Sequence, residues 1–376
     1  MQIEMVVHAP SESSGSLIRL IQSLDAADYL GSTPSLTIEL PQRVDLQLLQ
    51  FLQHLGGLTQ LPGRITIRRR IQPHDIDTAE SSLRTVESFY PRDPAMSHLL
   101  LLSPQTELAP SFYHYLKFTI LSYKQSSRAK RIFSKMAGIS LELPSSKPTA
   151  DSETFTPPPM AAEGKEQFLP SFLWQAPNSN AALYFGDIWA EFHSFLASRL
   201  STPQSAAAPQ TKLISEKYPA FMEHMLEMIQ ARGYYLLYPA FPGIKSSSIA
   251  TVHNELYQPP VEFEDSNSAT LGKEATQIIH EPTQPRKGGV STGLGSIEKP
   301  LSRASTIMPL LDLFPSGLPD YDALALLSYD GEGLTAATYT QQTEEYAQQF
   351  RIYYGGCARD SKIDEPLTDL LFCIQQ

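Results

Sequence analysis

Polar residues able to do chemistry stand directly after apolar runs in this sequence. His8 follows the run 3–7, and Ser103 and Gln105 follow the run 98–102. Histidine can transfer protons near neutral pH, and hydroxyl and amide groups hydrogen-bond to sugars, bases and phosphates. We therefore expect a binding site built from the ends of strands.

The elements that would position these residues alternate between strand and helix. Apolar residues in continuous or alternating runs predict strands, and apolar residues spaced by three or four predict helices. The predicted strands are residues 3–7, 36–40, 65–71 and 98–102, and the predicted helices are residues 17–24, 46–55, 78–90 and 112–123. This order favours an α/β fold with a mostly parallel sheet flanked by helices. Such a sheet binds ligands beyond the carboxyl ends of its strands, which here are residues 8–13, 39–43 and 103–107.

The later part of the chain continues this alternation less regularly. Strands are predicted at residues 138–143 and 234–238, helices at 189–200, 218–232 and near 343–350, and a loop at 103–110. By composition, residues 149–167 form a mobile loop, residues 202–210 a linker, and residues 261–305 a disordered segment. We expect one domain over residues 1–260, with residues 306–376 as a C-terminal extension packed on it.

Composition excludes some functions. The 376 residues carry a formal net charge of -11, which argues against non-specific nucleic-acid binding because phosphates require a basic excess. The basic stretch 64–70 is either a solvated strand face or a phosphate-facing patch. No apolar run is long enough for a membrane span, and no signal peptide precedes the first predicted strand. Cys357 and Cys373 could form one bridge or remain two buried thiols.

The segment 98–121, HLLLLSPQTELAPSFYHYLKFTIL, resembles the central strand and following helix of GT-A glycosyltransferases. In that family an apolar strand runs into an acidic triplet, and a Leu-x-x-Pro turn and a Phe-rich helix follow. Residues 8–24, 138–141, 175–189, 217–239 and the stretch ending in His253-Asn254-Glu255 resemble further segments of the family in the same order. As a set, residues 3–260 resemble a fungal glycosyltransferase family 2-type protein.

This resemblance implies a Rossmann-like GT-A fold and a hexosyltransferase-like activity, which moves a sugar from a nucleotide-sugar donor to a glycan or glycoconjugate acceptor. Longer forms of such proteins are membrane-associated, so an anchor ahead of Met1 would place the protein in the Golgi or endoplasmic reticulum. The residues expected to contact the donor are His8, Pro10, Glu12, Glu39, Ser103, Gln105 and Glu107. The residues expected to contact the acceptor are Trp174, Gln175, Asn178 and Asn180.

The sequence departs from the family at the acidic triplet, the DxD motif, where it has Ser103-Pro104-Gln105. Carboxylates at this place hold a Mg²⁺ or Mn²⁺ ion that stabilises the leaving diphosphate. Serine and glutamine are neutral, and Glu107 alone is a poor metal site. We therefore expect no metal ligands here, and either metal-independent catalysis by cationic side chains and backbone amides or an inactive protein.

Several candidates have a catalytic and a structural interpretation. An inverting transferase needs a general base, for which Asp187, His253 and Glu255 are candidates. Asp187 could instead cap the helix that follows, and His253 with Glu255 could be a structural hydrogen bond. His8 could contact the nucleotide or merely the backbone of its turn, and Trp174 could stack on a sugar or fill a buried loop. No G-x-S-x-G occurs, so a Ser–His–Asp hydrolase is excluded.

Two functions therefore remain open from the sequence. The first is a nucleotide-sugar glycosyltransferase. The alternative is a catalytically inactive GT-A-like protein that binds a glycan or nucleotide, or that serves as a scaffold for an active partner.

Overall fold

The computed structural model describes residues 1–10, 12–58, 63–69, 78–125, 135–149, 153–157, 161–162, 165–166, 171–209, 212–240, 249–253, 256, 317–358 and 370–373. The predicted disordered segment 261–305 lies outside the described residues, as does part of the predicted loop 149–167.

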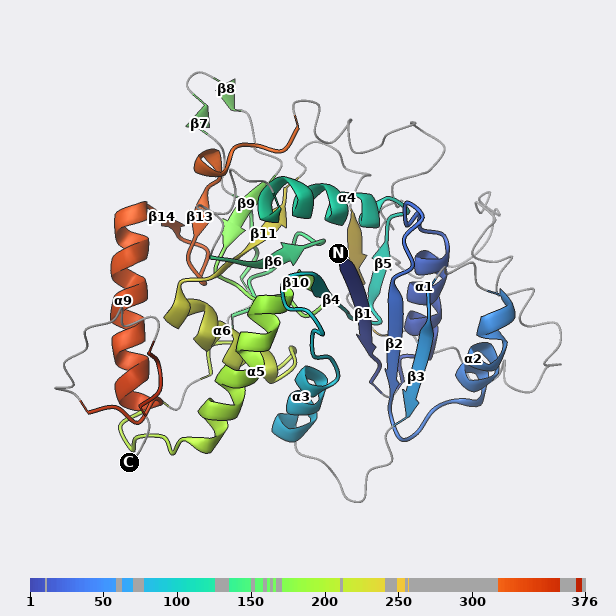
Figure 1. The fold of residues 1–376 in the computed structure, drawn as a ribbon, viewed down its shortest axis with the longest axis horizontal. Coiled ribbons are helices and arrows are strands. Elements are labelled where there is room, and N and C mark those ends of the chain that lie inside the picture. Colours follow the sequence, from blue (N-terminus) through green and yellow to red (C-terminus); the bar gives the residue numbers. More distant parts are fainter. Residues whose placement is uncertain are drawn as a thin grey trace, which may run out of the picture.

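The first hundred residues form the predicted alternation of strands and helices (Figure 1). The elements are β1 (Gln2–His8), α1 (Ser14–Asp25), β2 (Ser35–Leu40), α2 (Leu46–Leu58), β3 (Ile65–Arg69), α3 (Thr78–Glu87) and β4 (Ser97–Leu102). Apolar residues drive this order because β1, β2 and β4 bury them in the core together with those of the helices. Leu17, Leu20, Ile21 and Leu24 of α1 are all buried, at the helical spacing seen in the sequence.

Ten described strands form one mixed sheet in the order β14-β13-β9-β11-β6-β10-β4-β1-β2-β3. The added strands are β6 (Met136–Ser140), β9 (Ser171–Trp174), β10 (Ala181–Tyr184), β11 (Tyr235–Pro239), β13 (Leu326–Leu327) and β14 (Gly333–Leu334). β1 lies parallel to both β2 and β4, whereas β10 is antiparallel to its neighbours β4 and β6. The predicted class, an α/β fold with a mostly parallel, Rossmann-like sheet flanked by helices, is confirmed.

The central strand β4 is buried along its whole length, as the continuous apolar run predicted. Helices α4 (Phe112–Thr119), α5 (Gly186–Ser201) and α6 (Phe221–Arg232) cover the sheet (Figure 1). The helix α6 ends at Gly233, which has the left-handed φ of 68° that a C-cap glycine adopts.

The region predicted to be a loop at residues 103–110 is partly a strand. β5 (Thr106–Leu108) pairs antiparallel with β12 (Ala250–Val252), so the prediction of a loop throughout is wrong. The partner strand lies about 140 residues further along the chain, and local sequence pattern cannot show such a pairing.

The C-terminal segment packs on the body of the fold through a strand and a helix. β13 pairs with β9 in the main sheet, and α9 (Ala336–Tyr353) packs against α6, where the hydroxyl of Tyr339 donates to the carbonyl of Gly233. The predicted division into a domain at 1–260 and an extension at 306–376 stays a prediction.

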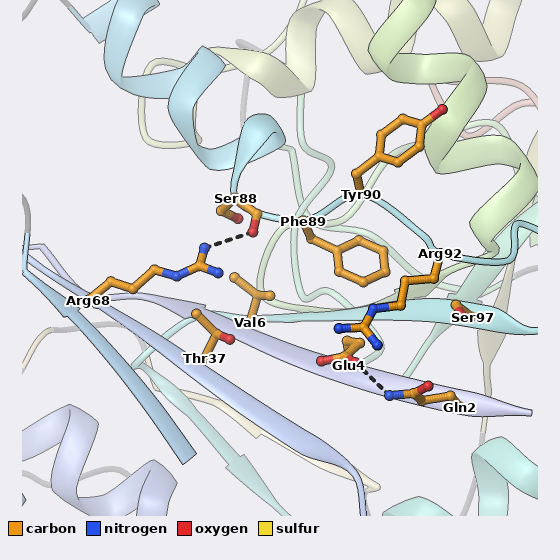
Figure 2. Close-up of a pocket in the computed structure, with 10 residues that line it drawn as sticks. All are labelled: Gln2, Glu4, Val6, Thr37, Arg68, Ser88, Phe89, Tyr90, Arg92 and Ser97. Atoms are coloured by element: carbon orange, nitrogen blue, oxygen red, sulfur yellow. Dashed lines mark hydrogen bonds between the residues drawn. The ribbon is translucent and has the colours of Figure 1, made fainter. Parts of the chain in front are cut away.

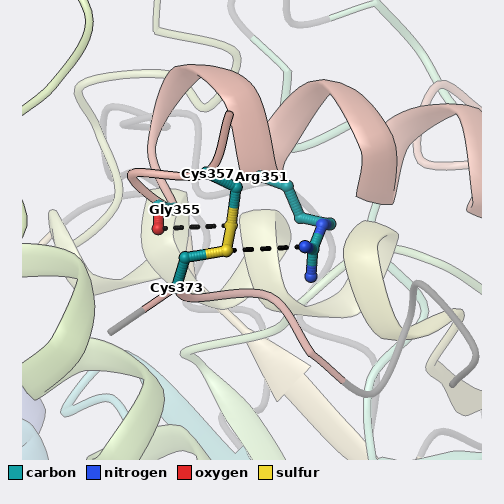
Figure 3. Close-up of a disulfide and its surroundings, with 4 residues drawn as sticks. All are labelled: Arg351, Gly355, Cys357 and Cys373. Atoms are coloured by element: carbon teal, nitrogen blue, oxygen red, sulfur yellow. Dashed lines mark hydrogen bonds between the residues drawn. A yellow bond between two sulfur atoms is a disulfide. The ribbon is translucent and has the colours of Figure 1, made fainter. Parts of the chain in front are cut away.

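The two cysteines form a disulfide, which decides between the two alternatives left by the sequence (Figure 3). Cys357 follows the end of α9, and Cys373 lies in the short described segment 370–373. The Cα atoms of the two cysteines are 5.1 Å apart. Nη2 of Arg351 on α9 lies 3.5 Å from Sγ of Cys373. The bridge therefore fastens residues 370–373 to the end of α9.

A search of the described residues for membrane spans finds no helix with the required length and apolar character.

Candidate functional site

The strand order reverses beside β1, and that is where an open α/β sheet binds ligands. The chain runs outward from β1 to β2 and β3 and then returns to form β4 on the other side of β1. The carboxyl ends of β1 and β4 therefore flank a topological switch point. His8 lies at this end of β1 and Ser103 directly follows β4, one step beyond the paired residues Val7 and Leu102.

Polar residues continue from this point across the neighbouring strands. On one side, His8 pairs in register with Glu39 of β2. On the other side, the backbone N–H of Ser103 donates to the carbonyl of Asn180 at 2.7 Å, and Glu142 follows the end of β6. We call Glu39, His8, Ser103, Asn180 and Glu142 the polar row. With neighbouring strands about 4.8 Å apart, the row extends over roughly 19 Å.

One end of the polar row holds a buried carboxylate beside two basic side chains. The carboxylate of Glu39 is only 2% exposed and lies 3.7 Å from Nδ1 of His8 and 3.7 Å from Nη1 of Arg68 on β3. Both distances exceed those of a hydrogen bond, so the contact of Glu39 with the always-charged Arg68 acts through charge attraction. His8 keeps 41% of its side chain exposed and can reach a ligand at the edge.

The turn after β1 carries the next two predicted donor residues. Pro10 and Glu12 are both exposed, and the carbonyl of Pro10 accepts a hydrogen bond of 2.6 Å from the hydroxyl of Ser13. Glu12 has a φ of 63°, which is uncommon for a residue other than glycine. These residues lie ahead of α1, which begins at Ser14, next to the switch point.

The segment Ser103-Pro104-Gln105 is held by backbone contacts and offers no carboxylate. The hydroxyl of Ser103 accepts from the N–H of Gln105 at 3.3 Å, and the carbonyl of Gln105 accepts from the N–H of His253 at 3.0 Å. Across the described ranges, no group of three His, Cys, Asp or Glu side chains could hold a metal ion. The residues at this strand end do not fit a Mn²⁺ or Mg²⁺ ion, because hard cations need several oxygen ligands.

Glu107 and His253 form an ion pair across β5 and β12. Oε2 of Glu107 lies 2.9 Å from Nε2 of His253, and each side chain is 20% exposed. The sequence suggested Glu255 as the partner of His253, but the structure pairs His253 with Glu107 because β5 and β12 lie side by side. Glu255 lies outside the described residues.

Arg19 on α1 faces this pair. Burial lowers the pKa of Arg19, and the charge of Glu107 opposes that shift. Its Nε and Nη2 atoms are buried and have no hydrogen-bond partner in the part of the chain that the structure describes. A desolvated guanidinium without acceptors is unfavourable, so this arginine has the character of an anion ligand. Sequence pattern alone does not single out Arg19, because it occupies an ordinary helical position.

Glu142 is the most unusual titratable residue at this edge, and the sequence-based candidates did not include it. Its side chain is buried, and Oε1 accepts from the side-chain amides of Asn178 at 2.7 Å and Asn180 at 3.0 Å. Burial raises the pKa of Glu142 to about 7, and the two hydrogen bonds oppose the rise. An acidic residue inside the predicted strand 138–143 was the available signal. A carboxyl group of this kind is suited to proton transfer near neutral pH.

Of the predicted acceptor residues, Trp174, Gln175 and Asn178 are buried and Asn180 is partly buried. Trp174 is fully buried, and the ring of Phe155 stacks on it at 4.2 Å, so Trp174 has no exposed face for a sugar and that prediction is wrong. Gln175 is also buried. The amides of Asn178 and Asn180 donate to Glu142, which gives them the role of orienting this carboxyl group.

Asp187 lies at the other end of the central strands, beyond the amino end of β4. β10 runs antiparallel to β4, with Ala181 opposite Leu102 and Tyr184 opposite Leu99, so the chain leaves the polar row before α5 begins. Oδ2 of Asp187 accepts from Nζ of Lys124 at 2.7 Å. The structure therefore does not bring Asp187 together with His8 or Ser103, and it places this acid in the first turn of α5.

Fold and candidate site together define an α/β protein with polar side chains gathered at the carboxyl ends of β1, β2 and β4. Residues 58–205 match the family described as SPBC1E8.03c C-terminal domain. No curated protein matches the sequence.

Several solved structures are similar to the chain. The mannosyltransferase PcManGT from Pyrobaculum calidifontis, in complex with GDP-Man and Mn²⁺, is 8% identical, with a TM-score of 0.34, and the match covers 64% of this chain and 57% of that one. GalNAc-T7 with UDP, GalNAc and Mn²⁺ is 10% identical, with a TM-score of 0.41 and coverage of 64% and 42%. TarS 1-349 of S. aureus in complex with UDP-GlcNAc is 10% identical, with a TM-score of 0.34 and coverage of 76% and 68%.

This chain thus spans 57% and 42% of the lengths of PcManGT and GalNAc-T7. Nothing about donor, acceptor or activity follows from similarity at this level.

Proposed function

We propose that this chain is a GT-A-type glycosyltransferase of the fungal family 2 type, which transfers a hexose from a nucleotide-sugar donor to a glycan or glycoconjugate acceptor. The observation that carries the proposal is the polar row at the switch point between β1 and β4. The row has a histidine and a carboxylate, which are groups able to hydrogen-bond to a base or ribose, at one end and a titratable carboxyl group at the other. We assign this activity to residues 1–260, with residues 306–376 as an extension and membrane association confined to longer forms.

The nucleotide would lie over the carboxyl ends of β1, β2 and β4. His8 and Glu39 would contact the base or ribose, and the turn with Pro10 and Glu12 would border the same place. Ser103 and Gln105 would lie next to the diphosphate. Their neutral side chains and the backbone N–H groups of this turn can hydrogen-bond to phosphate oxygens without a metal ion.

The charge of the departing diphosphate requires a cation at this edge. We assign that role to Arg19, whose buried Nε and Nη2 have no acceptor among the described residues. Helical side chains point toward the N-terminus of their helix, which in α1 means toward the turn after β1. A preorganised guanidinium stabilises negative charge that develops on a leaving group. Glu107, paired with His253, would then hold the neighbouring hairpin of β5 and β12 in place.

Glu142 would accept the proton of the attacking acceptor hydroxyl. The O–H bond breaks toward the carboxylate as the hydroxyl oxygen attacks the anomeric carbon and the nucleoside diphosphate leaves. Asn178 and Asn180 fix the carboxyl group through Oε1. His253 with Glu107 is the second candidate for this step, since it is the other acid–base pair at the same edge.

Binding of donors to the full chain tests the proposal. Thermal unfolding is measured with UDP-sugars, GDP-sugars and other nucleotide sugars, each with and without Mn²⁺. We expect one donor class to raise the midpoint equally with and without the metal ion. Arg19→Gln should abolish that rise, whereas Arg64→Gln, an exposed arginine on the far end of β3, should leave it unchanged. If no donor shifts the midpoint, the enzyme assignment is wrong.

The alternative, an inactive GT-A-like binding or scaffold protein, has one observation in its favour. Glu107, the acidic residue that follows Ser103-Pro104-Gln105 in the chain, already contacts His253, and no group of three His, Cys, Asp or Glu in the described residues could hold a metal ion. Donor-dependent stabilisation without release of nucleoside diphosphate, in the presence of a broad set of glycan acceptors, would establish this alternative.

A further inference from the structure

One face of the parallel half of the sheet carries polar residues. Parallel sheets are usually covered on both faces, and their strands then read as continuous apolar runs, as β4 does. In β1 to β3 the polar residues Glu4, Thr37 and Arg68 alternate with apolar ones instead. Because side chains alternate between the two faces of a strand, these polar residues share one face.

A cavity of about 190 Å³ lies on this polar face (Figure 2). Gln2 and Glu4 of β1 and Thr37 of β2 form its floor, and the segment that follows α3 covers it with Phe89 and Arg92. The ring of Phe89 points into the cavity above Val6. Drug-sized ligands occupy cavities of about 300 to 1,000 Å³, so this one suits a smaller molecule.

The walls of the cavity are held by hydrogen bonds from other elements. The carbonyl of Phe89 accepts from Nε1 of Trp189 at 3.1 Å and lies 2.8 Å from Nε2 of His193, both on α5. Nη1 of Arg68 donates to the carbonyl of Ser88 at 2.9 Å. The covering segment is therefore fixed over the sheet, and the cavity is preformed.

Basic side chains outnumber acidic ones in the lining of the cavity, and Arg68 also lies 3.7 Å from the carboxylate of Glu39. Arg68 and Arg92 both line it, and Glu4 is the one carboxylate among its lining residues in the described structure. Glu4 accepts a hydrogen bond of 2.7 Å from Nε2 of Gln2. Arg92 makes no hydrogen bond or ion pair with any described residue, and Figure 2 shows its guanidinium extending over Gln2 and Glu4. A guanidinium in such a place can donate two parallel hydrogen bonds to a carboxylate or phosphate.

We propose that this cavity is a second ligand site, which lies beside the Glu39 end of the polar row, and that it binds a small molecule bearing a phosphate or carboxylate through Arg92 and Arg68. The anionic group lies between the two guanidiniums. Gln2, Ser88 and Thr37 offer hydrogen bonds to hydroxyl groups of the ligand, and Phe89 provides an apolar wall.

Calorimetric titration of the full chain tests this site with three probes: inorganic phosphate, glucose 6-phosphate and glucuronate. We expect saturable binding of at least one, and the three probes distinguish a phosphate ligand from a carboxylate ligand. Arg92→Gln should weaken binding about tenfold or more, because it removes a charge-assisted hydrogen-bond pair. Glu4→Gln should strengthen binding, because it removes the one negative charge beside the anion. Arg64→Gln, which changes the net charge by the same amount outside the cavity, should have no effect.

The position of the ligand is checked independently by chemical modification. Phenylglyoxal reacts with accessible guanidinium groups, and mass spectrometry measures its rate at Arg92. The bound probe should slow the reaction at Arg92 and leave Arg64 unaffected. The proposal is overturned if no probe binds the wild-type chain, if Arg92→Gln binds as the wild type does, or if Glu4→Gln weakens binding.

Discussion

Nδ2 of Asn178 donates a 2.7 Å hydrogen bond to the carboxylate of Glu142. The contact joins the loop before β10 to the end of β6, and it sits at one end of the polar row. Asn180 adds a second amide at 3.0 Å to the same oxygen atom. This arrangement fixes the orientation of a buried carboxyl group without supplying a positive charge, and burial therefore determines its protonation.

We expect Glu142→Gln to abolish glycosyl transfer and leave donor binding intact. Glutamine keeps the size of the side chain and an oxygen that accepts from Asn178, but it cannot take up a proton. Loss of a positioned general base lowers the rate by about 10² to 10⁴. The measurement is nucleoside diphosphate release together with a donor thermal shift. A variant with wild-type turnover would remove Glu142 from the mechanism, and an equal loss in Glu107→Gln would point to His253 with Glu107.

The same substitution should change how stability depends on pH. The pKa of Glu142 is about 7 in the folded chain, above the value of about 4.3 in an unfolded one. The folded state therefore binds the proton more tightly than the unfolded state. The resulting contribution to the free energy of unfolding is fully present below about pH 4 and is lost as the pH rises through 7.

The wild type should therefore lose stability between about pH 4 and pH 8, whereas Glu142→Gln lacks this titration. The free energy of unfolding of the variant minus that of the wild type should rise by roughly 3 kcal/mol over this range. Chemical denaturation at a series of pH values measures this difference. Glu344→Gln, an exposed carboxylate on α9, serves as the control and should show no such trend. A flat difference for Glu142→Gln would mean that the carboxyl group titrates normally.

Restoring carboxylates at the end of β4 should create metal-dependent nucleotide binding. The double substitution Ser103→Asp with Gln105→Asp places two acids at the switch point, and carboxylates there can hold Mn²⁺ between protein and diphosphate. Calorimetry with a nucleoside diphosphate should show binding that strengthens with Mn²⁺. The matched pair Ser103→Asn with Gln105→Asn should show no metal dependence. Equal behaviour of the two double variants would move the diphosphate away from this strand end.

The buried ion pair between α5 and α6 should contribute strongly to stability. Nε and Nη2 of Arg199 each donate a 3.0 Å hydrogen bond to the carboxylate of Glu227, and both side chains are nearly buried. Glu227→Gln leaves the guanidinium without its counter-charge, which costs about 3 kcal/mol or more. Denaturant titration should show this loss. A change below about 1 kcal/mol would indicate that the cation–π contact of Arg199 with Tyr354 suffices.

The disulfide should stabilise the C-terminal segment. Cys357 and Cys373 are 16 residues apart, and closing a loop of that length raises the free energy of unfolding by about 3 kcal/mol. The double variant Cys357→Ser with Cys373→Ser should lose this amount, and a reducing agent should lower the wild type to the same value. Insensitivity of the wild type to reduction would show that the bridge contributes little.

The sequence predicted the parallel half of the fold well because its signals are local. The run 98–102 indicated a buried central strand, and β4 is that strand. The spacing of Leu17, Ile21 and Leu24 indicated α1 in the same way. Periodicity succeeds here because each strand or helix buries one face or stripe, whatever its partners are.

The pairing of remote segments could not be predicted in this way. The sequence placed His253 beside Glu255, its neighbour along the chain, and only the antiparallel contact of β5 with β12 brings Glu107 to it. Trp174 illustrates the same limit. An indole in a polar cluster suggested a sugar platform, yet Phe155 stacks on it in the folded chain.

The sequence by itself determined the class of fold, the strand ends that flank the switch point, and the absence of carboxylates at Ser103 and Gln105. These properties follow from residue type and local spacing. The tertiary structure alone decided which polar groups are desolvated together, as Glu142 is with Asn178 and Asn180, because burial depends on every element packed around a group. It also decided that Asp187 lies at the strand ends away from the polar row, since the direction of β10 is set by its pairing with β4 and β6.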